Sequence, residues 1–278
     1  MAETATSAPT IEFPSTPSIL IEIKEAKNDL NAIGKAIIGH KELAKEVLDT
    51  INAPYFSLVR EIKSVDEAVR MLGMNRIINL TTGRLLRTTI FSGKHKLLLD
   101  LWKTSIKVAV TSVLVSKELD KAATDESYTT AVFHNAGMAL LNQVNPEYPK
   151  AIKAAYFEED SHISLYETNH FNHSHAALSS QLATNWGLSG AISKCIFQHH
   201  DPDKIITSID KGDEAGELLL VLKIAEQISR LPGYLAQCVH NHEWEKIKEP
   251  IFDQLKMTEG MYRRFEVGIK KKIAEIKS

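Results

Sequence analysis

The sequence is poor in the residues that would build disulfide bonds, thiolate metal sites or membrane spans. It contains only two cysteines, Cys195 and Cys238, and they share no C-x-x-C or zinc-type spacing. We expect both to be buried, reduced thiols of a cytoplasmic protein. The longest apolar runs, such as Leu218 to Leu222, are far shorter than the roughly 20 residues that cross a bilayer, and residues 1–10 show no secretory signal. We therefore expect no membrane segment.

Several motifs of catalysis and nucleic-acid binding are also missing. There is no glycine-rich phosphate loop and no Ser-His-Asp nucleophile pattern, and Gly137 and Gly187 lie at expected helix boundaries. No DNA-binding motif occurs. Strand-type alternation and Asn-Gly or Asp-Gly hairpin turns are absent, whereas apolar residues recur with helical spacing along most of the chain. These patterns predict an all-α protein.

The composition is that of an ordinary folded protein, with 44% hydrophobic and 24% charged residues and a formal net charge of −2. The charge is unevenly spread, because basic residues exceed acidic ones between 60 and 107 and the reverse holds from 108 to 242. Arg76, Arg84 and Arg87 in the basic segment form a candidate surface for an anionic partner. We favour internal pairing with the acidic segment, because no aromatic stacking pattern accompanies these arginines.

Local signals mark a tail and several helix ends. Residues 1–13 are rich in Ala, Thr, Ser and Pro and predict a flexible tail. Ser64, followed three residues later by Glu67, has the spacing of a capping box at a helix start. Pro54 and the pair Tyr55-Phe56 are expected to end a preceding helix and to fill the core beside it.

Histidines supply the strongest chemical signal. His134 and Asn135 lie together in an apolar stretch from 131 to 141, and His175, His199 and His200 follow downstream. Taken alone, a His-Asn pair in such a stretch is typical of a packed, hydrogen-bonded pair. Histidines that converge from different helices could instead bind a transition metal, because imidazole suits zinc, nickel and iron better than magnesium.

Six segments of the chain resemble the HDOD domain, the signalling-output relative of the HD phosphohydrolases. They are Phe13-Pro14-x-x-Pro17, Leu43 to Phe56 with Asn52, the segment Ile62-Lys63-Ser64-Val65-Asp66-Glu67-Ala68-Val69-Arg70-Met71-Leu72-Gly73, Leu101-Trp102, Phe133-His134-Asn135-Ala136-Gly137, and Trp186-Gly187-Leu188 followed by His199-His200-Asp201-Pro202. The resemblance implies an N-terminal helical bundle (14–95) packed on an HD-like helical domain (96–240), followed by a C-terminal helical tail (241–278). It also implies bacterial signal transduction, usually without catalysis.

The departures from the HD pattern bear directly on function. An active HD site resembles H…HD…D, whose two histidines and two aspartates hold one or two metal ions. In this sequence the first histidine falls near Thr104, the His-Asp pair becomes His134-Asn135, and the last aspartate falls near Glu226. An amide oxygen supplies only a dipole where a carboxylate supplies charge, and a threonine hydroxyl is a weak neutral donor. We therefore expect a degenerate HD site and no cofactor.

The leading hypothesis is a non-catalytic regulatory protein that binds a signalling protein, in the groove between the N-terminal bundle and the HD-like half. One alternative is a metal-dependent phosphohydrolase or phosphodiesterase that uses a histidine-rich site. That site would consist of His134, His175, His199, His200 and Glu226, holding a divalent transition metal. Another alternative is a module that senses a nucleotide without hydrolysing it. The sequence predicts neither the partner nor the oligomeric state.

Overall fold

The computed structural model describes residues 11–26, 29–92, 96–157, 163–235, 238 and 240–277. Throughout these residues the regular structure is helical and no strand occurs, so the all-α prediction is confirmed. Most of the predicted flexible tail, residues 1–10, lies outside the described residues. Cys195 and Cys238 are both buried and free of disulfide bonds, as predicted.

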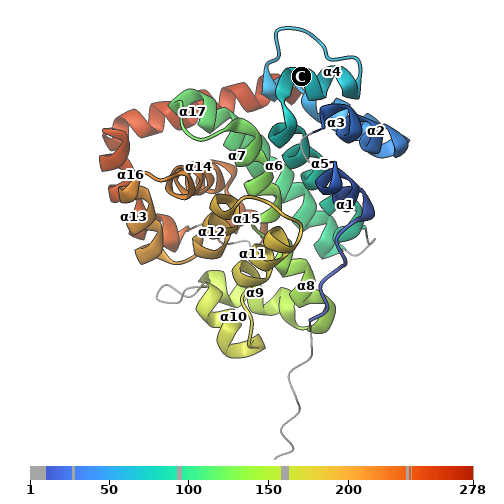
Figure 1. Ribbon diagram of the computed structural model, residues 1–278. Helices are drawn as coiled ribbons and strands as arrows, with labels where there is room; N and C mark the ends of the chain where they lie inside the picture. Colours follow the sequence, from blue (N-terminus) through green and yellow to red (C-terminus); the bar gives the residue numbers. More distant parts are fainter. Residues whose placement is uncertain are drawn as a thin grey trace, which may run out of the picture.

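The N-terminal bundle lies on the upper right side of the molecule in Figure 1. Its elements are α1 (Ser18–Glu25), α2 (Leu30–Gly39), α3 (Lys41–Ile51), the 3-10 helix η1 (Pro54–Phe56), α4 (Val65–Leu72) and α5 (Met74–Thr89). Helix α4 begins where predicted, because the Ser64 hydroxyl accepts a hydrogen bond from the Glu67 amide (3.2 Å). The long loop before it is fixed by Asn52, whose side chain bonds both backbone groups of Ile62 at 2.7 and 2.8 Å.

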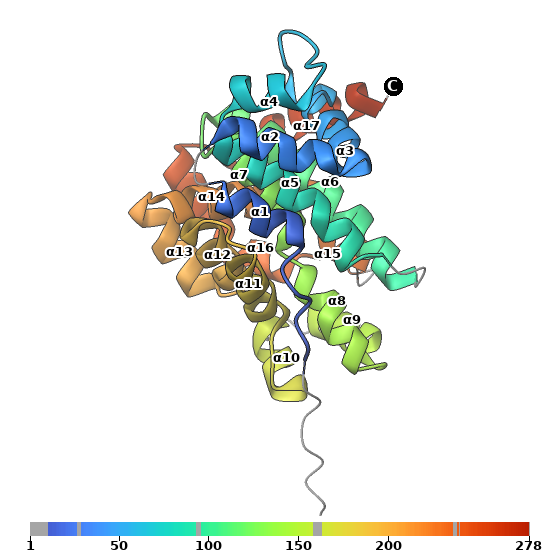
Figure 2. The ribbon, with the colours of Figure 1, turned by 45° about the vertical axis from the view of Figure 1, so that its right-hand side comes forward.

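The HD-like half is built around three helices, α6 (Lys96–Leu119), α7 (Thr124–Phe133) and α14 (Glu214–Ser229), which pack against one another. Around them lie α8 (Ala136–Val144), α9 (Tyr148–Phe157), α10 (Ile163–Phe171), α11 (His175–Asn185), α12 (Gly190–Gln198), α13 (Pro202–Lys211) and α15 (Leu231–Leu235). Figures 1 and 2 show α8 to α10 at the end of the molecule away from α2 to α4. Every residue of α7 from Ser127 to Phe133 is buried, which makes this helix the centre of the core.

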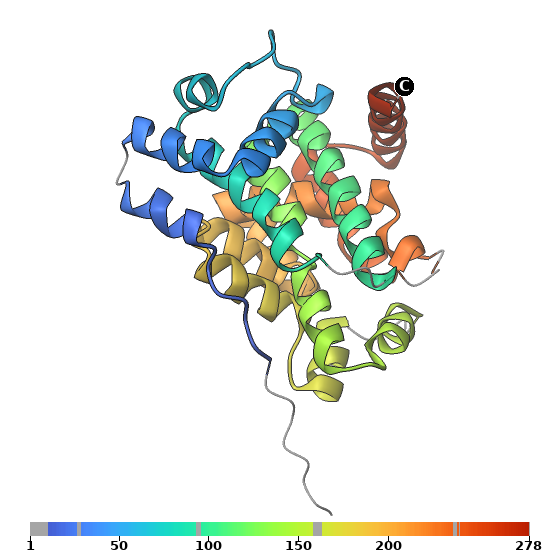
Figure 3. The same ribbon diagram turned by 90° about the vertical axis from the view of Figure 1, so that its right-hand side faces the viewer.

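Two further helices, α16 (His242–Leu255) and α17 (Glu259–Lys277), close the chain. Helix α16 packs on α13 and α14, and α17 packs on α6. Figure 3 shows α17 as a separate helix on the flank of the HD-like half. No helix among the described residues is both long enough and apolar enough to cross a membrane.

The two halves meet where α5 packs on α7. Asp125 of α7 accepts hydrogen bonds from Arg76 and Asn79 of α5, each at 3.0 Å. This ion pair joins the basic segment to the acidic one. Tyr55 of η1 stacks on Tyr128 of α7 with ring centroids 6.2 Å apart. The fold is therefore an N-terminal helical bundle packed on an HD-like helical domain, whereas the residue boundaries of these units stay a prediction.

One glycine permits a close approach that shapes the site. A Cβ atom at Gly137, near the start of α8, would lie 2.2 Å from the backbone oxygen of His175 at the start of α11. The Gly137 amide donates a hydrogen bond to the Ser179 hydroxyl at 2.7 Å. Because the backbones touch at this point, the start of α8 and the start of α11 lie side by side.

Candidate metal centre

The four histidines singled out from the sequence lie together in the core of the HD-like half. His134 follows the last residue of α7, His175 is the first residue of α11, and His199 and His200 follow α12. All four are buried, as is Glu226 of α14. Two groups have ligand atoms within 4.8 Å of one another, His175 with His199 and His200, and His134 with His199 and Glu226. His199 belongs to both groups and lies at the centre of the cluster.

Two of the rings have a tautomer fixed by the backbone. Nδ1 of His134 lies 2.6 Å from the carbonyl oxygen of Ala131, and Nδ1 of His199 lies 2.6 Å from that of Ile196. A carbonyl oxygen only accepts, so each Nδ1 carries the proton. Each Nε2 therefore presents a lone pair to the cluster, which is the arrangement of metal-binding histidines.

The other two rings are oriented by carboxylates. Nδ1 of His175 donates to Glu167 at 2.7 Å, and the same carboxylate accepts the His175 amide at 2.8 Å and the Tyr148 hydroxyl at 2.5 Å. Nδ1 of His200 donates to Glu243 at 2.6 Å. Carboxylate-histidine pairs of this kind fix ring orientation and make the second nitrogen a better ligand.

The inward-facing atoms create an electrostatic conflict that a cation resolves. Nε2 of His175 and Nε2 of His199 lie 3.4 Å apart, and Nε2 of His134 lies 3.4 Å from Oε1 of Glu226. Neutral imidazoles with protonated Nδ1 atoms would place acceptor against acceptor in both pairs. Tetrahedral zinc with Zn–N bonds of about 2.0–2.1 Å separates its ligand atoms by about 3.4 Å. Both distances fit a bound transition metal.

Burial keeps these rings neutral. It lowers the pKa of His134 to about 3 and the pKa of His199 well below its ordinary value. Burial also raises the pKa of Glu226 to about 7, although the ammonium of Lys223 works in the opposite direction. Neutral imidazole is the form that binds metal, so the two histidines are held in the ligating state.

The charges around the cluster also suit a divalent ion. Glu167, Glu226 and Glu243 surround it, and one ammonium, that of Lys223, pairs with Glu226 and Glu243. Carboxylates therefore outnumber ammonium groups around the cluster in the described part of the chain. A divalent cation would offset the excess of acidic groups.

The structure places the two substituted positions differently. Asn135 lies beside His134, and its side-chain amide is buried without a hydrogen-bond partner in the described part of the chain. The Thr104 hydroxyl bonds to its own helix, at the carbonyl oxygens of Asp100 (2.9 Å) and Leu101 (2.8 Å). Thr104 lines a groove beside Ile273 and Ile276 of α17. The histidines and Glu226 therefore come together, and Thr104 lies apart from them.

Arg76, Arg84 and Arg87, the candidate surface for an anionic partner, make internal contacts. Arg76 pairs with Asp125 at 3.0 Å, and Arg84 pairs with Glu46 at 2.9 Å. Arg84 and Arg87 lie over the Trp102 ring, at 6.0 and 5.6 Å from its centroid. An anionic-partner surface at these arginines stays a prediction.

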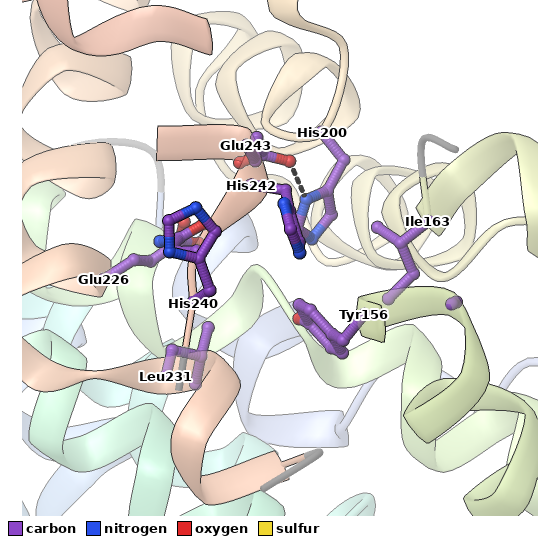
Figure 4. A pocket seen from close by; sticks show the side chains of 10 residues that line it. Tyr156, Ile163, His200, Glu226, Leu231, His240, His242 and Glu243 are labelled. Atoms are coloured by element: carbon purple, nitrogen blue, oxygen red, sulfur yellow. Dashed lines mark hydrogen bonds and ion pairs between the residues drawn. The ribbon is translucent and has the colours of Figure 1, made fainter. Parts of the chain in front are cut away.

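A small cavity adjoins the cluster, shown in Figure 4. Its volume is about 40 Å³, and its lining residues are Ala155, Tyr156, Ile163, His200, Glu226, Leu231, His240, Asn241, His242 and Glu243. Figure 4 shows His200 joined to Glu243 on one side and Tyr156 on the opposite side. The cavity has room for about one water molecule, whose share of liquid volume is about 30 Å³.

Sequence patterns did not identify three residues that shape the centre, namely Glu167, Lys223 and Glu243. Lys223 had a signal, because it is the one charged residue in the apolar run from Leu218 to Ala225. A lysine in such a run is buried only when it is paired. Glu167 and Glu243 lie in helical segments of mixed polarity, and only the packing of α10 and α16 brings them to the histidines.

Comparisons with known proteins agree with this architecture. The family model of the HDOD domain matches residues 13–202. An uncharacterised protein of Treponema pallidum (strain Nichols) is 24% identical over 199 residues, which are 68% of this chain and 38% of that protein. The chain thus spans well under half the length of this relative.

Solved structures share the fold. An HDOD domain protein of unknown function from Geobacter sulfurreducens superposes with a TM-score of 0.63 at 20% identity, covering 95% of this chain and 91% of that one. A candidate metal-dependent phosphohydrolase from Shewanella amazonensis SB2B gives 0.59 at 11% identity, covering 93% of both chains. A candidate signal transduction protein from Marinobacter aquaeolei VT8 gives 0.54 at 16% identity, covering 99% of this chain and 64% of that one. On the match of its sequence from 13 to 202, the chain belongs to the HDOD family.

Proposed function

We propose that this chain is a regulatory protein of bacterial signal transduction that holds one transition-metal ion in a closed histidine site and hydrolyses no phosphoester. The observation that carries the proposal is that the Nε2 atoms of several histidines converge. The Nδ1 atom of each of these rings already forms a hydrogen bond on the other side. His134 and His199 donate to backbone carbonyls, and His175 donates to Glu167. Such a set is built to present lone pairs inward.

The ligands would come from His199 together with His134 and Glu226, whose ligand atoms lie within 4.8 Å of one another. One divalent ion there would separate the acceptor atoms of His134 and Glu226, and the ring of His175 would stand beside it, with Nε2 3.4 Å from that of His199. A set of imidazoles and one carboxylate favours zinc, iron, nickel or copper over magnesium. Bound there, the ion would hold together the end of α7, the end of α12 and helix α14.

Two features argue against hydrolysis. The neutral amide of Asn135 stands where the HD pattern has a carboxylate, so one negative ligand is missing. The cavity beside the histidines measures about 40 Å³, whereas sites for small organic ligands measure about 300–1,000 Å³. A phosphodiester or cyclic dinucleotide has no room next to the buried nitrogens.

Partner binding is supported by a groove along the junction of the two halves. One part, about 620 Å³ in volume, lies between α6 and α17 and is lined by apolar side chains that include Ile106, Val110 and Ile273. A second part of about 270 Å³ lies between α3, α5 and α6. Tyr55 and Ile106 line both parts. We propose these two neighbouring pockets, which share Tyr55 and Ile106, as the surface for the regulatory protein.

Elemental analysis and hydrolysis assays on the purified chain test the proposal together. We expect one equivalent of transition metal, with no turnover of bis(p-nitrophenyl) phosphate or cyclic dinucleotides in the presence of zinc, manganese or nickel. Metal-dependent hydrolysis abolished by His199→Ala would establish the phosphohydrolase alternative instead. Calorimetric titration with nucleotides separates a sensing role, because a saturable heat without product would show binding.

A further inference from the structure

Among the residues that the structure describes, Lys223 supplies the ammonium that pairs with the carboxylates of the centre. It lies in α14 one helical turn before Glu226, and its side chain is 4% exposed. Its Nζ pairs with Oε2 of Glu226 and Oε1 of Glu243 and donates to the His199 carbonyl oxygen at 2.9 Å. A lysine ammonium has three N–H donors, so each one has an oxygen partner.

The surroundings of this ammonium are those of a hard metal ion. Two carboxylate oxygens and one backbone carbonyl are the ligand types that magnesium, manganese and calcium prefer. They converge from three places in the fold, which are α14, the start of α16 and the residue after α12. The ammonium therefore occupies a site formed by three oxygen atoms, and this site favours a positive charge.

Glu226 links this oxygen site to the histidine site. Its Oε1 faces Nε2 of His134 at 3.4 Å, while its Oε2 pairs with Lys223. Glu243 pairs with Lys223 through Oε1, and its Oε2 accepts a hydrogen bond from Nδ1 of His200, so only Glu226 faces both sites. A carboxylate that serves one cation with each oxygen is the bridge of a two-cation centre, in which metal ions lie about 3.5–4 Å apart.

We infer that the Lys223 ammonium occupies the position of a second cation, so that the centre holds one metal ion and one tethered ammonium. This inference rests on the proposed metal site at His199. Charge supports it, because the Lys223 ammonium already pairs with two of the carboxylates that border the centre. A second divalent ion beside this ammonium would bring two positive charges into contact in the core. Lys223 thus sets the number of ions, and it is a positioning residue and not a ligand.

Manganese stoichiometry of the purified full chain tests the inference. The protein is loaded with excess Mn²⁺, freed of unbound ion by gel filtration, and measured for metal content and by electron paramagnetic resonance. We expect the wild-type chain to hold one equivalent with the spectrum of an isolated ion. Lys223→Ala should hold two equivalents and show the broadened signal of two exchange-coupled ions, because the alanine leaves space and three oxygens.

Three further variants make the result specific. Lys223→Arg keeps the charge and should stay at one equivalent. Lys223→Gln removes the charge, keeps most of the side-chain volume and offers an amide oxygen, so it should hold two equivalents of Mn²⁺. This variant tests the inference even if Lys223→Ala fails to fold. The double variant Lys223→Ala with Glu243→Gln removes one carboxylate of the oxygen site and should hold only one equivalent of Mn²⁺. Circular dichroism checks that each variant is folded.

The outcomes separate the two proposals. A wild-type chain with no bound metal overturns the proposed function and the inference with it. A wild-type chain with one ion, together with folded alanine and glutamine variants that also hold one, overturns the inference alone. A wild-type chain with two coupled ions leaves the metal site standing and rejects the role of Lys223.

Discussion

Nε2 of His175 and Nε2 of His199 face each other across 3.4 Å in the core. Each ring has its Nδ1 on an acceptor, a carboxylate for His175 and a backbone carbonyl for His199. Two lone pairs at this distance repel unless a proton or a metal ion lies between them. This pair is one of the observations that support the proposed cation site.

Removing the shared histidine should abolish metal-dependent stabilisation. Zinc at a hundredfold excess over its dissociation constant should raise the free energy of unfolding of the wild-type chain by about 2.7 kcal/mol. His199→Ala should show no such gain in a thermal shift series. The matched control is His173→Ala, an exposed histidine, which should respond like the wild type. An unchanged zinc response in His199→Ala would place the metal elsewhere.

Glu167 should tune the centre through His175. Glu167→Gln replaces the carboxylate that orients the ring, and loss of such a partner typically costs 10- to 100-fold in metal affinity, a range of about 1.4–2.8 kcal/mol. Competition against a chromophoric chelator measures the change. Tyr148→Phe removes only the hydroxyl on the other carboxylate oxygen, so it should cost about 1 kcal/mol of stability and leave the affinity nearly unchanged. Equal affinity losses in both variants would contradict a specific role for Glu167.

Restoring a carboxylate at Asn135 should separate the effects on folding and on metal binding. Asn135→Asp buries a charge without a partner and should lower the metal-free free energy of unfolding by about 1–3 kcal/mol. Saturating zinc should recover this loss, because the new carboxylate can neutralise the ion. Denaturant unfolding with and without zinc measures both values. Asn185→Asp, on an exposed end of α11, should change either value by less than about 0.5 kcal/mol.

A carboxylate pair remote from the histidines should make stability depend on pH. Burial and the neighbouring Glu214 raise the pKa of Glu126 from its ordinary 4.5 to about 7. The folded chain therefore binds this proton more tightly than the unfolded chain, and the contribution present below pH 4.5 is lost as the pH rises through about 7. Glu126 is half-exposed, so solvent screening limits the effect to about 1 kcal/mol. Glu126→Gln should remove this part of the slope in urea unfolding measured between pH 5 and 8, and an unchanged slope would refute the assignment.

The contact at Gly137 should tolerate no side chain. A Cβ there would lie 2.2 Å from the His175 backbone oxygen, so α8 and α11 would have to separate. Gly137→Ala should lower the free energy of unfolding by about 3 kcal/mol or more, within the range of severe overpacking. The control is Gly190→Ala in α12, where nothing lies within 4 Å and helix propensity predicts a gain of up to about 1 kcal/mol. Similar effects in both variants would mean that the backbone contact is not rigid.

The sequence by itself determined the helical class, the capped start of α4 and the set of histidines that could meet. These features follow from local rules, since Ser64 and Glu67 act within one turn and apolar spacing marks each buried helix face. The match to a known family supplied the expected pairing of the two halves. The same comparison of residues pointed to His134, Asn135 and Glu226.

Only the tertiary structure decided how these residues are used. Glu167 and Glu243 reach His175 and His200 from α10 and α16, across separations that no local pattern records. The sequence showed Lys223 only as a charge in an apolar run, and packing gave it three oxygen partners. The geometry of the ligands and the charge around them depend on residues from distant segments, so both arise only when the helices pack together. For that reason the pocket, expected as a hydrolase relic, is now proposed as a one-metal centre with a built-in ammonium.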